Sequence, residues 1–480
     1  MLPSKAKAAR PPSKVKAAHQ AEAVKQLPVL PFEFAWRDYV VYLLHVGAEI
    51  EHSLMVQYLY AAWSLGGPHL SVKQQEKVAE WQREILGIAK EEMGHLITVQ
   101  NLLRLIGGPL NFERDEYPFQ SEFYPFNFTL ERLTLKSLAK YVWAESPPTW
   151  SGKLALEIKR KARHANRGVI TPVGKLYGTI IELMESTAPA FLAERDFQAH
   201  TAAAQASPDD WARGYQHSTT DARVRSEQHH GTDAVTAGTP RSAQILIQVM
   251  RSRQEAVEAL VELSEQGEGT TGQEDPDERS TPSHFARFLK IYRELKRAGF
   301  DPSRPVPQNP KTVDIPDSMP GGDDRDMDRQ LITNREALGW AHLFNIRYRL
   351  LLMDLTHALS LAGQHLEEQV SAARGSLINW TFGEMYNLRA IGGILMECPL
   401  RPKGDARKQA AGPPFDMPYS LILPDTHADR WRLHRDLLEA SGLEIDTLQD
   451  LHSGHAGYLS ALAEADKLAL EKIKLLMSNG

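Results

Sequence analysis

The chain has 480 residues, of which 42% are hydrophobic and 24% charged, the composition of an ordinary globular protein. A net charge of −6 gives no general affinity for nucleic acid or for an anionic membrane, and no uncharged apolar run reaches the roughly 18 residues that a membrane helix needs. The single cysteine, Cys398, excludes an internal disulfide framework and argues against thiolate metal ligands. We expect a cytoplasmic protein.

The N-terminus, residues 1–30, is basic and rich in Ala, Lys and Pro, and it lacks the apolar core of a signal peptide. We interpret it as a disordered arm.

The first predicted helix spans residues 34–65 and ends at a Gly-Gly-Pro stop signal. Within it, Glu49 falls on a mixed face, whereas Glu51 is surrounded at helical spacing by residues that are apolar or nearly so. These neighbours are Leu44, Gly47, Ala48, Leu54, Met55 and Tyr58. We predict that Glu51 is buried.

The second predicted helix runs from about Ser71, a suitable N-cap, to Ile106, and it also ends at Gly-Gly-Pro. Glu92 and His95 share one face of it, one turn apart, among Ile85, Ile88, Ala89, Leu96 and Val99. Two such helices predict a hairpin about 45 Å long, half of a four-helix bundle.

Buried Glu51 and Glu92 need compensation, because an unpaired carboxylate in an apolar layer costs several kcal/mol. Glu-x-x-His is the pair that di-iron and di-manganese bundle sites combine with a Glu from a neighbouring helix. A hydrogen-bonded core histidine is the alternative for His95. Two apolar-faced acids on consecutive helices favour a metal.

The residues 49–62 and 89–96, closed by 101–109, resemble the ferritin-like domain of the iminophenylpyruvate dimer synthase family, and the resemblance continues to 412–418. That family includes the enzymes that join two indolepyruvate imines in violacein and rebeccamycin biosynthesis. The resemblance implies an all-α fold, a ferritin-like four-helix bundle with long crossover loops and an additional C-terminal helical region. It also implies one or two iron ions, with manganese as the alternative.

An aromatic, prolyl crossover (111–127) follows the hairpin, and we expect it to be irregular. A shorter helix, 129–145, ends before two prolines, and its last acid, Glu145, is a further candidate ligand. Residues 149–166 are basic and are predicted to form a loop.

A third bundle helix is predicted from Thr171. Periodicity favours Glu185 as its ligand. The resemblance favours Glu182, because the family pattern places an acid shortly after the tyrosine matched by Tyr177. We slightly prefer Glu182 as the ligand, and Glu185 stays open as the alternative.

Residues 245–250 alternate enough to predict a short strand, and Ser252 opens a fourth helix with a capping box. We expect Gly267 to end that helix and to leave Glu268 on a tight turn. The resemblance makes Glu268 and His284 the second carboxylate and imidazole, with Glu265 as the alternative acid.

The predicted domains are a bundle over 31–300, a linker over 301–330 and a C-terminal helical region over 331–480, which carries apolar stripes near 335–361 and 367–398. We find no chemistry in the last helices.

These residues predict a non-haem metal-dependent oxidase that acts, with dioxygen, on a small aromatic metabolite derived from an amino acid, and the resemblance implies oxidative imine coupling. Aromatic side chains of the crossover and Trp63, Trp143 and Trp150 offer surface for an aryl group, and Arg83 and Arg104 are arginines that could hold a carboxylate. The alternatives are a metal-storage bundle and a structural bundle. A homo-oligomer stays open.

Overall fold

The computed structural model describes residues 34–114, 123–186, 192–210, 245–269, 282–313, 330–361 and 373–478. Within these ranges the chain forms helices and no β-strands, which confirms the all-α prediction. None of the described helices is both long and apolar enough to cross a membrane. The predicted arm at residues 1–30 lies outside the described residues.

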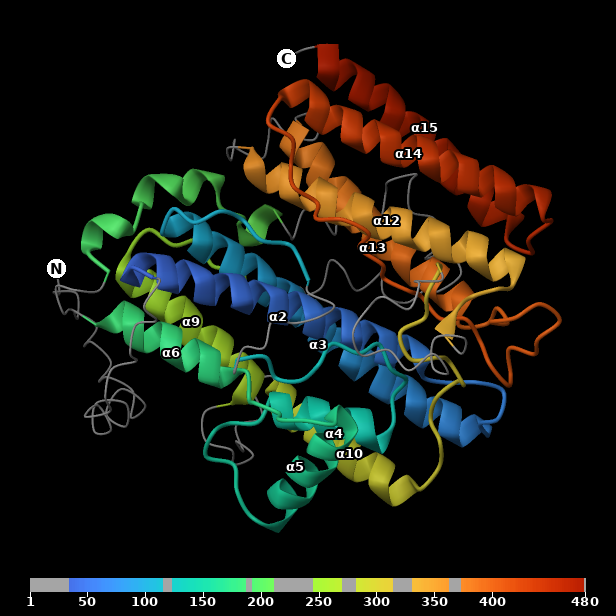
Figure 1. The fold of residues 1–480 in the computed structure, drawn as a ribbon, viewed down its shortest axis with the longest axis horizontal. Helices are drawn as coiled ribbons and strands as arrows, with labels where there is room; N and C mark the ends of the chain where they lie inside the picture. Colours follow the sequence, from blue (N-terminus) through green and yellow to red (C-terminus); the bar gives the residue numbers. More distant parts are fainter. Residues whose placement is uncertain are drawn as a thin grey trace, which may run out of the picture.

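The two predicted hairpin helices form the centre of the N-terminal bundle (Figure 1), as α2 (Trp36–Ser64) and α3 (Val72–Leu105). Ser71 precedes α3, and its backbone N–H donates to Gln74 Oε1 at 2.8 Å. The side chains of Glu51, Glu92 and His95 are buried in the hairpin, as their apolar neighbours predict.

The other half of this bundle consists of two interrupted helices. The first is α4 (Leu135–Ala144) followed by α6 (Gly174–Glu185), and the second is α9 (Arg253–Glu268) followed by α10 (His284–Ala298). Helix α4 packs on α10, and α6 packs on α9. The N–H of Val173 donates to the carbonyl of Ala144 at 2.9 Å, so α6 begins where α4 ends.

Three local predictions need correction. Residues 153–166 form α5 (Lys153–Asn166) instead of a loop, because Ala155, Ile158 and Ala162 give that basic segment a buried stripe. The helix predicted from 129 begins at Leu135, where the Thr134 side chain accepts from the backbone N–H of Ser137 at 3.2 Å. Each correction follows from a local capping or packing pattern.

The third correction concerns residues 245–250, which form no strand. Their backbone groups bond to side chains of the bundle instead, since Thr98 Oγ1 donates to the Leu246 carbonyl at 3.0 Å and Asn101 Nδ2 to the Gln248 carbonyl at 2.8 Å. A Cβ on Gly94 would lie 2.7 Å from Ile245, so this close approach requires glycine in α3.

Four further helices form a C-terminal group above the hairpin (Figure 1). They are α12 (Arg335–Ser360), α13 (Ala373–Leu395), α14 (His427–Asp450) and α15 (Ala456–Ser478). Helix α12 packs on both α13 and α14, and α14 packs on α15. The part of 301–330 that is described packs on the N-terminal bundle, where Arg304 N–H donates to Ser64 O at 2.7 Å.

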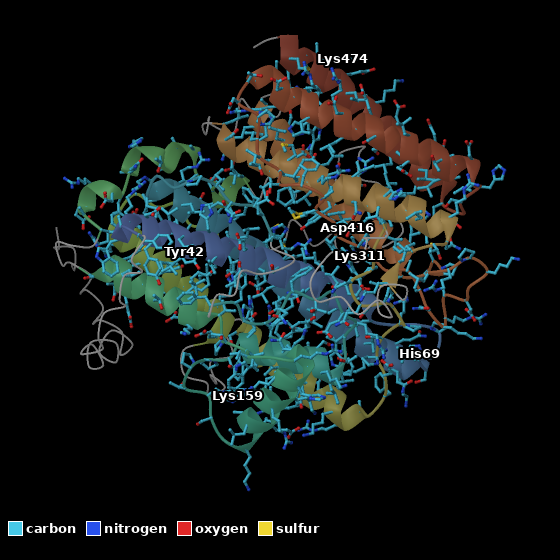
Figure 2. The ribbon with its side chains drawn as sticks, in the orientation of Figure 1. Tyr42, His69, Lys159, Lys311, Asp416 and Lys474 are labelled. Atoms are coloured by element: carbon cyan, nitrogen blue, oxygen red, sulfur yellow. The ribbon has the colours of Figure 1, made fainter. Side chains whose placement is uncertain are left out.

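The segment 412–418, the last part of the family resemblance, lies between the two helical groups. Phe415 stacks on Trp63 with ring centroids 5.8 Å apart and also packs on Phe344 and Tyr348. Its φ of 54° is unusual for phenylalanine, and these ring contacts hold it there. The next residue, Asp416, labelled in Figure 2, accepts a hydrogen bond from Thr312 Oγ1 at 2.9 Å.

Candidate metal centre

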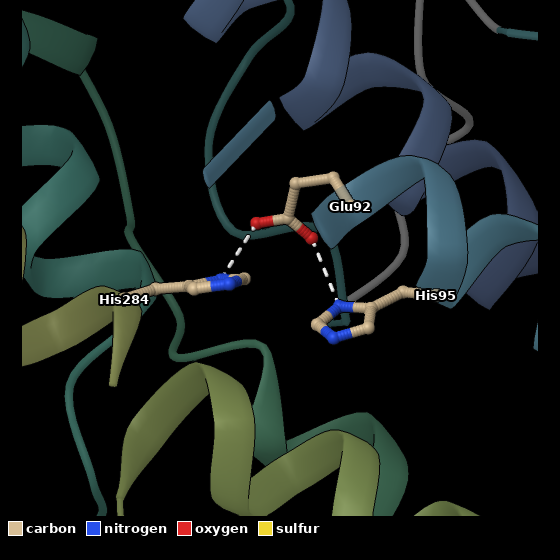
Figure 3. Close-up of side chains that lie close together, drawn as sticks. All are labelled: Glu92, His95 and His284. Atoms are coloured by element: carbon tan, nitrogen blue, oxygen red, sulfur yellow. Dashed lines mark hydrogen bonds and ion pairs between the residues drawn. The ribbon is translucent and has the colours of Figure 1, made fainter. Parts of the chain in front are cut away.

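A buried cluster of carboxylates and imidazoles forms where the two interrupted helices face the hairpin. Ligand-type atoms of Glu92, His95 and His284 all lie within 4.8 Å of one another. Glu92 lies between the two rings (Figure 3), with Oε2 3.0 Å from His95 Nδ1 and Oε1 3.0 Å from His284 Nδ1. The α3 helix and the first residue of α10 therefore meet at one carboxylate.

Two more carboxylates extend the cluster on either side of Glu92. Glu51 Oε2, from α2, is 3.5 Å from His95 Nδ1. Glu145 Oε2, at the C-cap of α4, is 3.8 Å from His284 Nδ1. The cluster thus has two halves, each with one imidazole and one acid of its own, and Glu92 belongs to both.

Both histidines present Nδ1 to the cluster because their outer nitrogens are bonded elsewhere. His95 Nε2 donates to Gln266 Oε1 at 2.8 Å, and His284 Nε2 donates to Glu91 Oε2 at 2.9 Å. An outer hydrogen bond of this kind sets the tautomer and the ring orientation of a metal-binding histidine.

The outer carboxylates are held in the same way by tyrosines. Tyr177 on α6 donates to Glu51 Oε1, and Tyr58 on α2 donates to Glu145 Oε1 at 2.5 Å. The other oxygen of Glu51 faces the cluster. In each acid, a tyrosine hydroxyl holds one carboxylate oxygen, and the second oxygen is available to bind a metal.

Four buried atoms at the cluster make no hydrogen bond of good geometry within the described residues, although two of them, Glu92 Oε1 and His284 Nδ1, form an ion pair at 3.0 Å. The four atoms are Glu51 Oε2, Glu92 Oε1, Glu268 Oε1 and His284 Nδ1. Buried polar atoms are normally paired with good geometry, so oxygen and nitrogen atoms that converge without it are what a metal site presents. Carboxylate and imidazole donors suit iron or manganese.

Burial and mutual repulsion raise the pKa values of the acids, whereas the two imidazoles lower them. Burial, reinforced by Glu92, raises the pKa of Glu51 to about 8. Burial alone would raise the pKa of Glu92 too, but His284 and His95 outweigh it and hold that pKa well below its usual value. Burial opposes the charge on His95, yet hydrogen bonds to Glu51 and Glu92 raise its pKa to about 10. The raised pKa values of Glu51 and His95 mean that both groups favour their protonated forms at neutral pH, which offsets part of the negative charge of the cluster.

Glu268 completes the acidic side of the cluster. It is the last residue of α9, so the helix continues past Gly267 and ends at Gly269, whose φ is 78°; the tight turn predicted at Glu268 is corrected accordingly. Burial and the nearby Glu145 raise the pKa of Glu268 to about 8. A Cβ on Gly174 would lie 1.6 Å from Glu268 Oε1, so glycine at the start of α6 makes room for this carboxylate.

The expected ligands from α6 and the alternative on α9 are not part of this cluster. Glu182, Glu185 and Glu265 are exposed. Tyr177 and Ile180 are on the buried face of α6, and Glu182, five residues after Tyr177, lies about 140° around the helix from it. The structure thus brings together Glu51, Glu92, His95, Glu145, Glu268 and His284.

Sequence reasoning missed Glu91 and Arg287, which lie behind His284. Arg287 Nη2 and Nη1 donate to the two oxygens of Glu91 at 2.5 and 3.2 Å. Burial is outweighed by His284 and Arg287, so the pKa of Glu91 is lowered. The adjacent acids Glu91 and Glu92 were a usable signal, since one helix can direct neighbouring side chains to different partners.

A cleft of about 900 Å³ between the two helical groups reaches this outer pair. We call it the interbundle cleft. Its walls include Trp63, Trp81, Glu91, Arg287, Leu355 and Tyr386. Because Glu91 is in direct contact with His284, the cleft lies one side chain away from the cluster.

Of the expected aromatic surface, only Trp63 lines the interbundle cleft within the described residues. Trp150 packs on Phe285 with centroids 4.9 Å apart, and Trp143 packs on Trp150 at 6.1 Å, so both belong to the core. Arg104 donates to the Leu359 carbonyl and joins the two helical groups, whereas Arg83 is an exposed residue of the cleft.

Comparison with known proteins agrees with this fold. The chain is 25% identical over 417 residues to dichlorochromopyrrolate synthase of Lentzea aerocolonigenes, covering 79% of this chain and 36% of that protein. It therefore spans about a third of the length of that relative. A solved ferritin-like protein from Caulobacter vibrioides is similar with a TM-score of 0.38 and 15% identity, over 76% of this chain and 98% of that one. The ferritin-like family model matches residues 44–293, more than half of the chain. The resemblance seen in the sequence is confirmed, and the chain belongs to the ferritin-like family.

Proposed function

We propose that this protein is a non-haem, metal-dependent oxidase whose cluster binds two iron ions, with manganese as the alternative. Glu51, Glu92 and His95 would hold one ion, and Glu92, Glu145 and His284 the other, with Glu268 beside the second. The observation that carries the proposal is that both imidazoles direct Nδ1 toward the shared Glu92 while their Nε2 atoms are bonded elsewhere.

Iron or manganese bound by carboxylates and imidazoles supplies activation of dioxygen or peroxide. The chain itself orients the ligands through Tyr58, Tyr177 and Gln266, and it excludes bulk water from the cluster by burying it. Dioxygen chemistry in a dry, preorganised site protects reactive species from side reactions with water.

The substrate that we propose is a small aromatic metabolite derived from an amino acid, oxidised in specialised metabolism. Two features support it. The interbundle cleft has aromatic and aliphatic walls next to the cluster, and the curated relative is named as a synthase of dichlorochromopyrrolate. Oxidative coupling of imines is the reaction type that the family resemblance favours.

The test is dioxygen uptake by iron-loaded protein, with and without aryl pyruvates plus the matching amine donor. The proposal expects uptake that requires both the metal and the organic compound, and that disappears in the Glu92→Gln, His95→Ala double variant. Uptake driven by ferrous iron alone, with many ions stored per chain, would instead identify a storage protein. Protein that takes up no metal would identify a structural bundle.

A further inference from the structure

The interbundle cleft is lined by a guanidinium group whose N–H donors are only partly bonded. Arg287, on α10, is 8% exposed and lines the cleft. Its two Nη atoms donate to Glu91, whereas its Nε is buried and makes no hydrogen bond within the described residues. A guanidinium carries five N–H donors in a fork that matches a carboxylate, so this arginine retains capacity for a second anion.

The charges around the cleft also favour an anion. Its described walls contain six basic side chains and four acidic ones: Lys77, Arg83, Lys90, Arg287, Lys290 and Arg389 against Glu80, Glu84, Glu91 and Glu294. Lys77 contacts two of these acids, at 2.8 Å from Glu80 and 3.0 Å from Glu294. The described walls therefore carry two more basic than acidic side chains, next to apolar surface.

Helix α3 borders the cleft beside Arg287 at Gly87, where a Cβ would lie at an ordinary contact distance, 3.9 Å, from Arg287 Nη1. Trp63, Trp81 and Tyr386 contribute aromatic surface farther along the walls. The cleft thus combines one anion-binding end with a flat apolar body, the layout of a site for an aromatic acid.

We infer that Arg287 binds the carboxylate of an aromatic acid in the interbundle cleft, and that Glu91 occupies part of the same guanidinium when the cleft is empty. This inference rests on the proposed function for the fate of the bound acid, but the binding itself requires no metal. Glu91 also accepts a hydrogen bond from His284 Nε2. An acid that displaces Glu91 from Arg287 would therefore also affect the hydrogen bond that orients His284.

The test compares indole-3-propionate with its neutral amide, indole-3-propionamide, by calorimetric titration of the metal-free full chain. The acid should bind about 10- to 100-fold more tightly than the amide, the range expected for a charge-assisted hydrogen bond. Arg287→Gln should remove this preference by weakening the acid alone. The matched control Arg297→Gln, an exposed arginine on the same helix that does not line the cleft, should keep it.

Glu91→Gln gives a result of opposite sign. It removes the internal competitor, so the acid should bind more tightly than in the wild type, whereas a general folding defect would weaken both ligands. Equal affinity for acid and amide in the wild type, or an undiminished preference in folded Arg287→Gln, overturns the inference. Because metal-free protein is used, a failure of the oxidase proposal leaves these binding results unaffected. A parallel titration with Mn²⁺ tests metal binding separately from binding of the acid.

Discussion

Both helical groups of this chain place carboxylates at the centre of a bundle, but they neutralise them differently. In the C-terminal group, Arg347 on α12 lies between Glu384 on α13 and Asp466 on α15, with Nη1 3.3 Å from Glu384 and 2.7 Å from Asp466. Ser441 on α14 donates to Asp466 at 3.0 Å. Each of the four helices contributes one residue, and the cation is part of the chain.

In the N-terminal bundle, Glu91 contacts Arg287, but no contact of Glu51, Glu92 or Glu145 within the described residues is with an arginine or a lysine. Their partners are the imidazoles of His95 and His284 and two tyrosine hydroxyls, and Glu268 lies beside Glu145. Two divalent ions would balance four carboxylates and leave both imidazoles neutral. The difference teaches that a buried acid cluster that contacts an arginine of the chain is a structural device, whereas one whose described partners are imidazoles and hydroxyls calls for a cation from outside.

The largest expected effect comes from removing the arginine of the C-terminal group. Arg347→Met leaves Glu384 and Asp466 buried without their cation, so the free energy of unfolding should fall by about 3–5 kcal/mol, measured by urea denaturation. The exposed control Arg432→Met should change it by less than about 0.5 kcal/mol. Metal content should stay at the wild-type level. A loss below about 1 kcal/mol for Arg347→Met would contradict the role given to this arginine.

The N-terminal side should respond to metal. Adding Mn²⁺ at about one hundred times its Kd to metal-free protein should raise the free energy of unfolding by about 3 kcal/mol for each ion bound, about 5 kcal/mol for two, and a chelator should reverse the rise. The Glu92→Gln, His95→Ala variant should show no rise, while Glu182→Gln should respond as the wild type does. An equal rise in the double variant would show that the metal binds elsewhere.

A smaller effect should come from the outer shell. Glu91→Gln weakens the acceptor that orients His284, so metal affinity should fall by about 10- to 100-fold, as measured by competition with a chromophoric chelator. Glu84→Gln, on the same helix but exposed, provides the control. Unchanged affinity in Glu91→Gln would mean that Glu91 does not orient His284.

The smallest effect concerns histidines, which the two bundles perturb in opposite directions. His95 has a raised pKa, whereas burial and the neighbouring His434 lower the pKa of His357 to about 3. A lowered pKa means that unfolded protein takes up the proton first. Stability contributed by neutral His357 is therefore complete above pH 6.5 and is lost as the pH falls toward 3, by up to about 1.4 kcal/mol per pH unit.

His357→Gln should flatten this slope between pH 6.5 and 5, measured by urea denaturation at several pH values. The exposed His69→Gln should keep the wild-type slope. Identical slopes in wild type and His357→Gln would show that His357 is protonated in the folded chain.

Much of the hairpin could be predicted from the sequence because its signals are local. Helical periodicity placed Glu51, Glu92 and His95 on apolar faces, and two Gly-Gly-Pro signals fixed the ends of α2 and α3. These residues lie within long, regular helices, where position along the chain determines orientation in space.

The other half of the site depends on contacts that no local pattern encodes. Glu145 and Glu268 lie at helix ends, and His284 begins a helix, so their convergence depends on how the interrupted helices pack. The expectation for Glu182 rested on a resemblance in spacing, whereas the direction of α6 is set by Tyr177 reaching Glu51. Arg287 was missed because its partner, Glu91, is distant in sequence.

The most direct test of the central claim is metal content, measured by mass spectrometry on protein produced with iron and manganese supplied. The account predicts about two equivalents of iron or manganese per chain in the wild type and in Glu182→Gln, and a loss of both ions in the Glu92→Gln, His95→Ala variant. Folded wild-type protein that carries no metal although both were supplied would contradict it, and Glu51, Glu92 and His95 would then form a hydrogen-bonded network within the core.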